Sequence, residues 1–331
     1  MIVALAILAA LAGLALVGFF WWAGRGTSPT SAKHGLFVDQ AGPPPATIAP
    51  GCYTMVTYNL GYLSGLANNR PVWREPTEFA AHLAQVRSAW QTLRPDLISY
   101  QEIDYGAARS FGVDQSAALA EGCYAFRADA VNWDKRYVPF PYWPPKVHFG
   151  RVLSGQSLHS RFPVRLLEHV VLPMPPERPF FYRRFYTDRL AQVCAVQLPE
   201  GEIVVINLHL EAYIASARIA QIKVVEQLYL TYRSLAPVII AGDFNIAASV
   251  PTTDAPDLLG QLLLWPGLAC AIPPGEWGMA QHLTFPSNAP IEQIDFIFYD
   301  SARLINHASG ISRLAGTASD HCPVWLQFSF R

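Results

Sequence analysis

Carboxylate, amide and imidazole side chains recur in this sequence directly after short apolar runs. The clearest case is Val238-Ile-Ile-Ala-Gly-Asp-Phe-Asn245, in which four apolar residues and a glycine lead into Asp243 and Asn245. A continuous apolar run of this length is typical of a strand buried on both faces, and Gly242 permits a tight turn at its end. Asp243 and Asn245 would then face the same way. Taken alone, the stretch is equally consistent with an Asx-rich turn.

The same arrangement, an apolar run followed by a polar residue, occurs at several other places in the chain. The polar residues concerned are Asn59, Glu102, His209, Asp243, Asn245, Asp295, Asp320 and His321. Ligands of α/β proteins bind beyond the ends of the strands, so we expect these side chains to meet in one site. Asp295 lies inside an apolar run, where an unpaired carboxylate would cost several kcal/mol. It therefore needs a partner, and a histidine is the natural one.

Residue types of this kind, when they meet in one site, can transfer protons and bind a hard metal ion through oxygen. Mg²⁺ prefers oxygen ligands and takes one or two carboxylates together with water. A zinc site is not expected, because the five cysteines are scattered and form no C-x-x-C pair.

Strands and helices follow one another irregularly after residue 51, and we find no repeat and no clear second domain. Strands are predicted at 53–58, 97–100, 166–172, 190–198, 203–208, 238–241, 294–298 and 324–330, and helices at 79–93 and 215–232. This mixture suggests two packed sheets with helices outside. The aromatic residues Trp133, Tyr137, Phe140, Tyr142 and Trp143 are expected in a proline-rich loop.

Seven short stretches carry a resemblance to a known family. They are Thr57-Tyr-Asn59, Ser99-Tyr-Gln-Glu102, Ser160-Arg-Phe-Pro163, Ile206-Asn-Leu-His-Leu210, Gly242-Asp-Phe-Asn245, Ile294-Asp-Phe-Ile297 and Ser319-Asp-His321. In this order they resemble the endonuclease/exonuclease/phosphatase (DNase I-like) superfamily, in the form of a membrane-anchored bacterial-type member. The resemblance implies an α/β fold, a four-layer α/β sandwich of two mixed β-sheets flanked by helices. It also implies a Mg²⁺-dependent phosphodiesterase, for which Mn²⁺ is a substitute.

The resemblance also implies where the metal ion and the phosphate would bind. Glu102 and Asn59 would hold the metal ion, and Asp320 would support the same ion or a second one. Arg189 matches an arginine that contacts phosphate in the deoxyribonuclease branch, with a surface ion pair as the alternative. His159 departs from the aliphatic residue usual at its position, and we interpret it as a packing residue.

The remaining residues would carry the proton transfers and bind the phosphoryl oxygens. His321 would act as general acid-base, oriented and made more basic by Asp295, while Asp243 would orient or deprotonate the attacking water. Either His321 or Asp243 could be the base. Asn245 and His209 would donate hydrogen bonds to phosphoryl oxygens.

The N-terminal residues predict a membrane anchor. Residues 2–23 carry no charge, exceed the roughly 20 apolar residues that cross a bilayer, and end in the aromatic run Phe19-Phe-Trp-Trp22. We therefore divide the chain into an anchor (1–24), a Pro/Gly/Ser-rich linker (25–51) and a catalytic domain (52–331). The alternative, a cleaved signal peptide, is disfavoured by the missing basic n-region and the long apolar core.

The sequence gives two opposing indications of the orientation of the anchor. Arg25 and Lys33 follow the span, which by the positive-inside rule favours a cytoplasmic body. An N-terminal anchor ahead of a large domain more often exports that domain. We expect the catalytic domain to be extracytoplasmic.

Charge and aromatic content bear on the substrate. The net charge is -1 and only four lysines occur, so there is no basic field for nucleic acid. Asp104 also stands where nucleases of the superfamily carry a cation. The aromatic loop and the segment 180–186, with Arg183 and Arg184, suggest a lip that dips into lipid and binds phosphates.

These observations favour a phospholipid or sphingolipid headgroup as the substrate and the lipid bilayer as the partner, and no obligate protein partner is evident. A membrane-tethered Mg²⁺-dependent DNA endonuclease is the alternative. A catalytically inactive phosphate-binding module is the second alternative.

Overall fold

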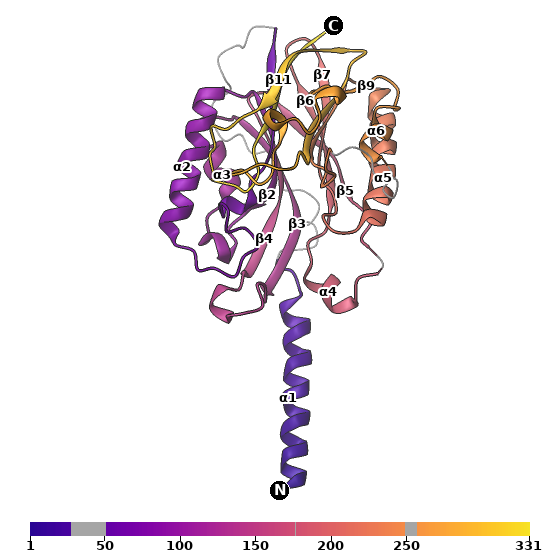
Figure 1. The fold of residues 1–331 in the computed structure, drawn as a ribbon. Coiled ribbons are helices and arrows are strands. Elements are labelled where there is room, and N and C mark those ends of the chain that lie inside the picture. The colour runs from indigo at the N-terminus through magenta and orange to yellow at the C-terminus, as the bar shows by residue number, and fades with distance from the viewer. Residues whose placement is uncertain (28–50, 176, 249–256) are drawn as a thin grey trace.

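The computed structural model describes residues 1–27, 51–175, 177–248 and 257–331, so most of the predicted linker (28–50) lies outside the described residues. Within these described ranges, twelve strands in two sheets are flanked by helices (Figure 1). The helices are α1 (Ile2–Ala23), α2 (Pro76–Leu93), α3 (Gln115–Ala120), α4 (Phe180–Phe185), α5 (Ala215–Arg233) and α6 (Leu258–Leu262).

Each sheet has six strands and contains both parallel and antiparallel pairs. The first has the order β11-β12-β1-β2-β4-β3, formed by Leu304–Ile311, Val324–Phe330, Tyr53–Asn59, Leu97–Asp104, Gly150–Ser160 and Phe126–Val138. The second has the order β5-β6-β7-β8-β10-β9, formed by Val164–Val171, Leu190–Gln197, Glu202–His209, Val238–Asp243, Asp295–Asp300 and Leu268–Cys270. The strands β1 and β2 are parallel, as are β7 and β8.

The layers are held together by three apolar clusters. The inner faces of the two sheets meet in a core that includes Met55 and Leu158 from one sheet and Val205 and Ile239 from the other. The helix α5 covers the outer face of the second sheet, where Tyr229 and its neighbours are buried. The helix α2 covers the first sheet in the same way. The four-layer α/β sandwich predicted from the sequence is confirmed.

Among the described residues, α1 is the one helix long and apolar enough to cross a membrane, and none of its apolar window is buried in the body. Figure 1 shows it projecting from one end of the sandwich, with the C-terminus at the opposite end. Its C-terminal end is attached to the body, because the backbone N–H and hydroxyl of Thr27 both donate to Asp134 Oδ1, at 2.8 and 3.0 Å. The N–H of Arg136 donates to the carbonyl of Arg25 at 2.8 Å.

The prediction of an aromatic loop at 133–143 is wrong for the first half of that range. Trp133 and Tyr137 lie in the 13-residue strand β3, and Trp133 is buried in a satellite core with Tyr62 and Phe149. The apolar and polar residues of β3 do not alternate regularly, since its pairing with β4 shifts register twice. Tyr142 and Trp143 do lie in the loop after β3 and are exposed.

Candidate active site

Most of the predicted site residues come together at one edge of the sandwich. Asn59 and Asp243 are the last residues of β1 and β8, and His209 is the last residue of β7. His209 is level with Asp243 in the parallel pair, and Asp295 is level with Asp243 in the antiparallel pair. His321 comes shortly before β12, which runs from there to the C-terminus. In Figure 1 this places the edge at the end of the sheets that faces α1.

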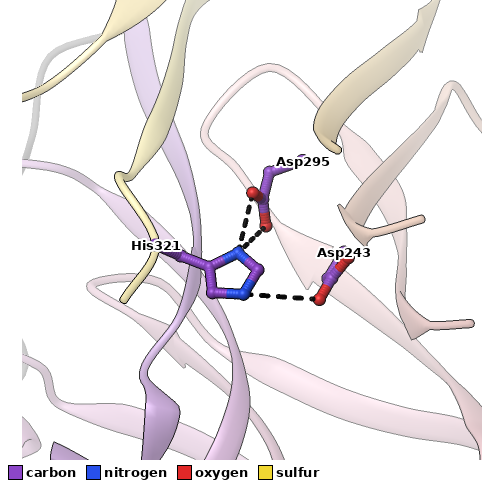
Figure 2. Close-up of side chains that lie close together, drawn as sticks. All are labelled: Asp243, Asp295 and His321. Carbon is purple, nitrogen blue, oxygen red and sulfur yellow. Dashed lines mark hydrogen bonds and ion pairs between the residues drawn. The ribbon is translucent and has the colours of Figure 1, made fainter. Parts of the chain in front are cut away.

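His321 lies between two carboxylates at this edge. Its Nδ1 donates to Asp295, 2.9 Å from Oδ2 and 3.2 Å from Oδ1, and its Nε2 is 3.9 Å from Asp243 Oδ2. Figure 2 shows Asp295 on one side of the imidazole and Asp243 on the other. All three residues are buried. The histidine partner expected for Asp295 is therefore present.

The charges of this trio depend on one another. Burial alone would lower the pKa of His321, but Asp295 and then Asp243 outweigh it and raise that pKa well above its usual value. Burial, followed by the charge of Asp295, raises the pKa of Asp243. The site thus favours a proton on His321, and Asp243 is the neighbouring group whose own pKa is raised.

Asn59 and His209 both contact Asp243. The Nδ2 of Asn59 donates to Asp243 Oδ2 at 2.9 Å, while its Oδ1 accepts from the N–H of Gly61. His209 Nε2 is 3.5 Å from Asp243 Oδ2 and 3.9 Å from Glu102 Oε1. Burial and the neighbouring Arg189 hold the pKa of His209 well below its usual value. The imidazole is neutral, and its Nε2 accepts a hydrogen bond from Arg189.

Glu102 and Asp320 form the second acidic part of the site. Asn68 bridges them, since its Nδ2 donates to Glu102 Oε2 at 3.0 Å and is 3.4 Å from Asp320 Oδ1. Burial and the charge of Asp320 raise the pKa of Glu102. The Oδ1 of Asn68 is buried and has no hydrogen-bond partner among the described residues. The two carboxylates offer oxygen donors of the kind that fit a hard divalent cation.

A second set of residues offers a different place for a cation. One donor atom each from Asp243, Asp295 and His321 lies within 4.8 Å of the others. However, the imidazole nitrogen nearest Asp295 is already used in a hydrogen bond with it. We therefore favour Glu102 and its neighbours for the metal ion and keep this trio for proton transfer.

Arg189 lies inside the site, and its neighbours were not predicted. Its Nη2 donates to the Tyr186 hydroxyl at 3.1 Å, and its Nε is 3.7 Å from Glu211 Oε2. The Tyr186 hydroxyl in turn donates to Glu211 at 3.1 Å. Glu211 follows His209 by two residues, the same spacing that separates Asp243 from Asn245, and this spacing could have identified it. Arg189 is a buried residue of the site edge, so the alternative of a surface ion pair does not hold.

Three other candidates occupy different positions. Asn245 flanks the site in a left-handed conformation, its N–H donating to Asp243 Oδ1 and its Nδ2 to the carbonyl of Leu210. Arg183 and Arg184 lie on α4 and have no hydrogen bond to the site residues described above. Arg184 instead donates to the carbonyl of Trp21 and stacks on its ring, 4.7 Å from the centroid.

Asp104, at the position where nucleases of the superfamily carry a cation, is fully buried. It accepts two hydrogen bonds from Arg109, at 2.8 and 3.1 Å, and a third from Ser154. The Arg109 guanidinium lies over the rings of Tyr62 and Trp133. Asp104 therefore has a structural role in an ion pair and does not face a substrate.

Residues 56–321 match the Endonuclease/Exonuclease/phosphatase family, and a search of curated proteins finds no match. One similar structure is an endonuclease/exonuclease/phosphatase from Beutenbergia cavernae DSM 12333, with 22% identity, a TM-score of 0.59, and coverage of 84% of this chain and 72% of that one. The human Nocturnin catalytic domain with bound sulfate shows 16% identity, a TM-score of 0.55, and coverage of 86% and 96%.

A third similar structure is D. rerio TDP2 complexed with a single-strand DNA product, with 16% identity, a TM-score of 0.56, and coverage of 84% and 99%. At such low sequence identities, the similarity to these structures shows only that the fold is shared. The family match covers most of the chain, and members of that family are typically phosphoester hydrolases that use divalent metal ions. This chain belongs to the endonuclease/exonuclease/phosphatase family.

Proposed function

We propose that this protein is a Mg²⁺-dependent phosphodiesterase, with Mn²⁺ as a substitute, that hydrolyses a phospholipid or sphingolipid headgroup. The observation that carries the proposal is the His321–Asp295 pair facing Asp243, with Glu102 3.9 Å from the same His209 nitrogen that contacts Asp243. A proton-transfer group and a cation-binding carboxylate thus share one buried edge. That combination suits phosphoester hydrolysis.

The residues would divide the chemistry between them. Glu102 would hold the cation with help from Asp320 and Asn59, and the cation would neutralise charge on the phosphoryl oxygens. Asp243 would orient or deprotonate the attacking water. His321 would exchange a proton at Nε2, because Asp295 keeps Nδ1 protonated and the ring fixed.

Phosphoryl oxygens would be bound by neutral and cationic donors at the same edge. Arg189 would supply charge, and Asn245 has a second amide hydrogen available. His209 would act as a donor only once Arg189 has turned from its Nε2 toward the substrate and that nitrogen carries a proton. Tyr186 and Glu211 would keep Arg189 in place until then.

The lipid assignment is supported by the surface around the C-terminal end of α1. Phe20 packs edge-on against Phe180 and Phe185 of α4, and Phe19 packs against Tyr137 of β3. Beside these contacts lie strongly exposed aromatic side chains: Tyr142 at 71%, Trp143 at 76%, Phe180 at 73% and Phe181 at 56%. Aromatic residues of this kind prefer the headgroup region of a bilayer. The site edge faces the same end of the molecule.

We also propose that α1 is a retained single-pass anchor. The contact of Trp21 with Arg184 favours this, because cleavage near residue 25 would remove Trp21. Since a large domain after an N-terminal anchor is usually exported, we propose that the body is extracytoplasmic.

A panel of substrates tests the proposal. The full chain in detergent or vesicles is given sphingomyelin vesicles, phosphatidylinositol vesicles, plasmid DNA and a small soluble phosphodiester, each with Mg²⁺. We expect a lipid to be hydrolysed with the highest catalytic efficiency. Higher efficiency on DNA would establish the alternative of a membrane-tethered endonuclease, and no hydrolysis of any substrate would establish an inactive phosphate-binding module.

A further inference from the structure

Asn68 occupies an unusual position between two carboxylates of the site. The residue is buried, with 8% of its surface exposed, and its Nδ2 donates to Glu102 at 3.0 Å. The same nitrogen is 3.4 Å from Asp320 Oδ1. Its Oδ1, by contrast, is buried without a hydrogen-bond partner among the described residues. Buried amide oxygens are nearly always paired, so this one calls for a partner that the protein itself does not supply.

The backbone at Gly61 provides the room in which this amide lies. Gly61 has a φ of +52°, which favours glycine. A Cβ at this position would lie 2.7 Å from Asp320 Oδ1 and 3.3 Å from Asn68 Nδ2. Any side chain there would push Asp320 or Asn68 aside, so the space between Asn68 and Asp320 requires a glycine.

The amide of Asn59, unlike that of Asn68, has hydrogen-bond partners at both its oxygen and its nitrogen, and its oxygen keeps a second lone pair for the cation. Asn59 uses its Oδ1 to accept from the N–H of Gly61 at 3.0 Å and its Nδ2 to donate to Asp243 at 2.9 Å. Asn59 therefore links the turn at Gly61 to the proton-transfer trio. Asn68 is the amide that contacts Glu102.

We infer that Asn68, through its Oδ1, is an oxygen ligand of the divalent cation proposed for Glu102, an inference that rests on the proposed function. Rotation of the amide about Cβ–Cγ exchanges its oxygen and nitrogen. In the absence of a cation, the N–H group faces the two carboxylates as a donor. When a cation neutralises those carboxylates, the oxygen is the better group to present.

Metal binding by the full chain in detergent micelles tests this inference without any activity assay. Mg²⁺ and Mn²⁺ are titrated by calorimetry and by the metal-induced shift in melting temperature. Asn68→Leu keeps the shape of the side chain and removes its oxygen. We expect it to weaken Mg²⁺ binding by at least about tenfold. We expect Asn68→Asp, which restores an oxygen, to bind at least as tightly as the wild type.

A role as hydrogen-bond donor alone predicts the opposite sign. Without the bridging amide, Glu102 and Asp320 would repel each other more strongly, and Asn68→Leu would bind Mg²⁺ as tightly as the wild type or more tightly. That result would overturn the inference. Asn69→Asp, at the neighbouring exposed position, controls for added charge and should bind like the wild type; a gain equal to that of Asn68→Asp would also count against a ligand role.

The same titration separates this inference from the proposed function. If the wild type shows no saturable binding of either metal, the metal-dependent function fails as well. If the wild type binds and Asn68→Leu binds equally well, the proposed function stands and only the role of Asn68 is refuted. Should Asn68→Leu not fold, Asn68→Ala is titrated in its place, with the metal-free melting temperature as the check of folding.

Discussion

The Nδ1 hydrogen of His321 is donated to Asp295, with 2.9 Å between nitrogen and carboxylate oxygen. Both side chains are buried, and they come from segments that start different strands of different sheets. The pair fixes which nitrogen carries the proton and leaves Nε2 for the reaction. The distance between the two side chains depends on how the two sheets pack against each other, because each sheet supplies one member of the pair.

Asp295→Asn keeps the size of the side chain and removes its charge. We expect turnover to fall by about a hundredfold or more, because His321 loses the partner that orients it and raises its pKa. The rate against pH should also change shape, since the pKa of His321 falls. Glu292→Gln, an exposed neighbour in the preceding segment, is the matched control and should keep the wild-type rate. A normal rate and pH profile in Asp295→Asn would show that the pair is only structural.

The exposed aromatic residues near α1 should matter for lipid substrates only. Trp143→Ala combined with Phe181→Ala should lower vesicle hydrolysis by about tenfold or more, because each inserted aromatic contributes roughly 1.5–3 kcal/mol of interfacial binding. Hydrolysis of a small soluble phosphodiester should not change. The control is Leu235→Ala with Leu264→Ala, which removes two exposed apolar side chains, 74% and 82% exposed, that belong to other segments. Equal losses on both substrates would mean that the aromatic residues serve folding alone.

Residues 1–24 should hold the protein in the membrane fraction. We expect the full chain to resist high salt and alkaline washing and to be released by detergent, because α1 is long and apolar enough to span a bilayer. A mature chain that begins near residue 25 would show a cleaved signal instead. Protease treatment before and after lysis tells on which side the body lies, and protection of the body in intact cells would contradict an extracytoplasmic location.

The buried His159 should make the fold sensitive to acid. Burial, followed by the charge of Arg127, lowers its pKa to about 3 in the folded protein, against about 6.5 in the unfolded chain. The unfolded chain therefore takes up a proton below pH 6.5 while the folded protein does not. The contribution of His159 to the free energy of unfolding should therefore decrease from pH 6.5 toward pH 3, by about 2 kcal/mol at pH 5.

Denaturant unfolding at pH 7.5 and pH 5 measures this effect. His159→Phe removes the titrating group, so the difference in stability between the two pH values should shrink. His307→Gln, at an exposed position, should leave that difference as it is in the wild type. An unchanged pH dependence in His159→Phe would assign the acid sensitivity to other groups.

The strands that carry the site were predictable because their apolar runs are uninterrupted. Every residue of β8 is buried, so its apolar run predicts a strand that is covered on both faces. The polar residue at the end of that run is then predicted to lie at the end of the strand. Asp243, His209 and Asn59 were located by the same reasoning. The pairing of Asp295 with a histidine followed from the cost of burying a lone carboxylate.

Other parts depend on contacts that no local pattern contains. Trp133 looked like a loop residue, yet it packs on Tyr62 and Phe149, which are distant in sequence. Asn68 lies in the loop between β1 and α2, and only the folded chain brings it to Glu102. The sequence shows only that Asp104 stands where nucleases of the superfamily carry a cation. Its role as the partner of Arg109 in a buried ion pair depends on the fold.

The central claim is metal-dependent hydrolysis at the edge formed by His321, Asp243 and Glu102. Its most direct test is the rate of phosphodiester hydrolysis by the full chain with Mg²⁺ and with EDTA, for the wild type, His321→Ala and Asp243→Ala. We predict turnover with Mg²⁺, none with EDTA, and a loss of about a hundredfold or more in each variant whose fold is intact. Full activity in EDTA, or near-normal rates in both variants, would contradict the account.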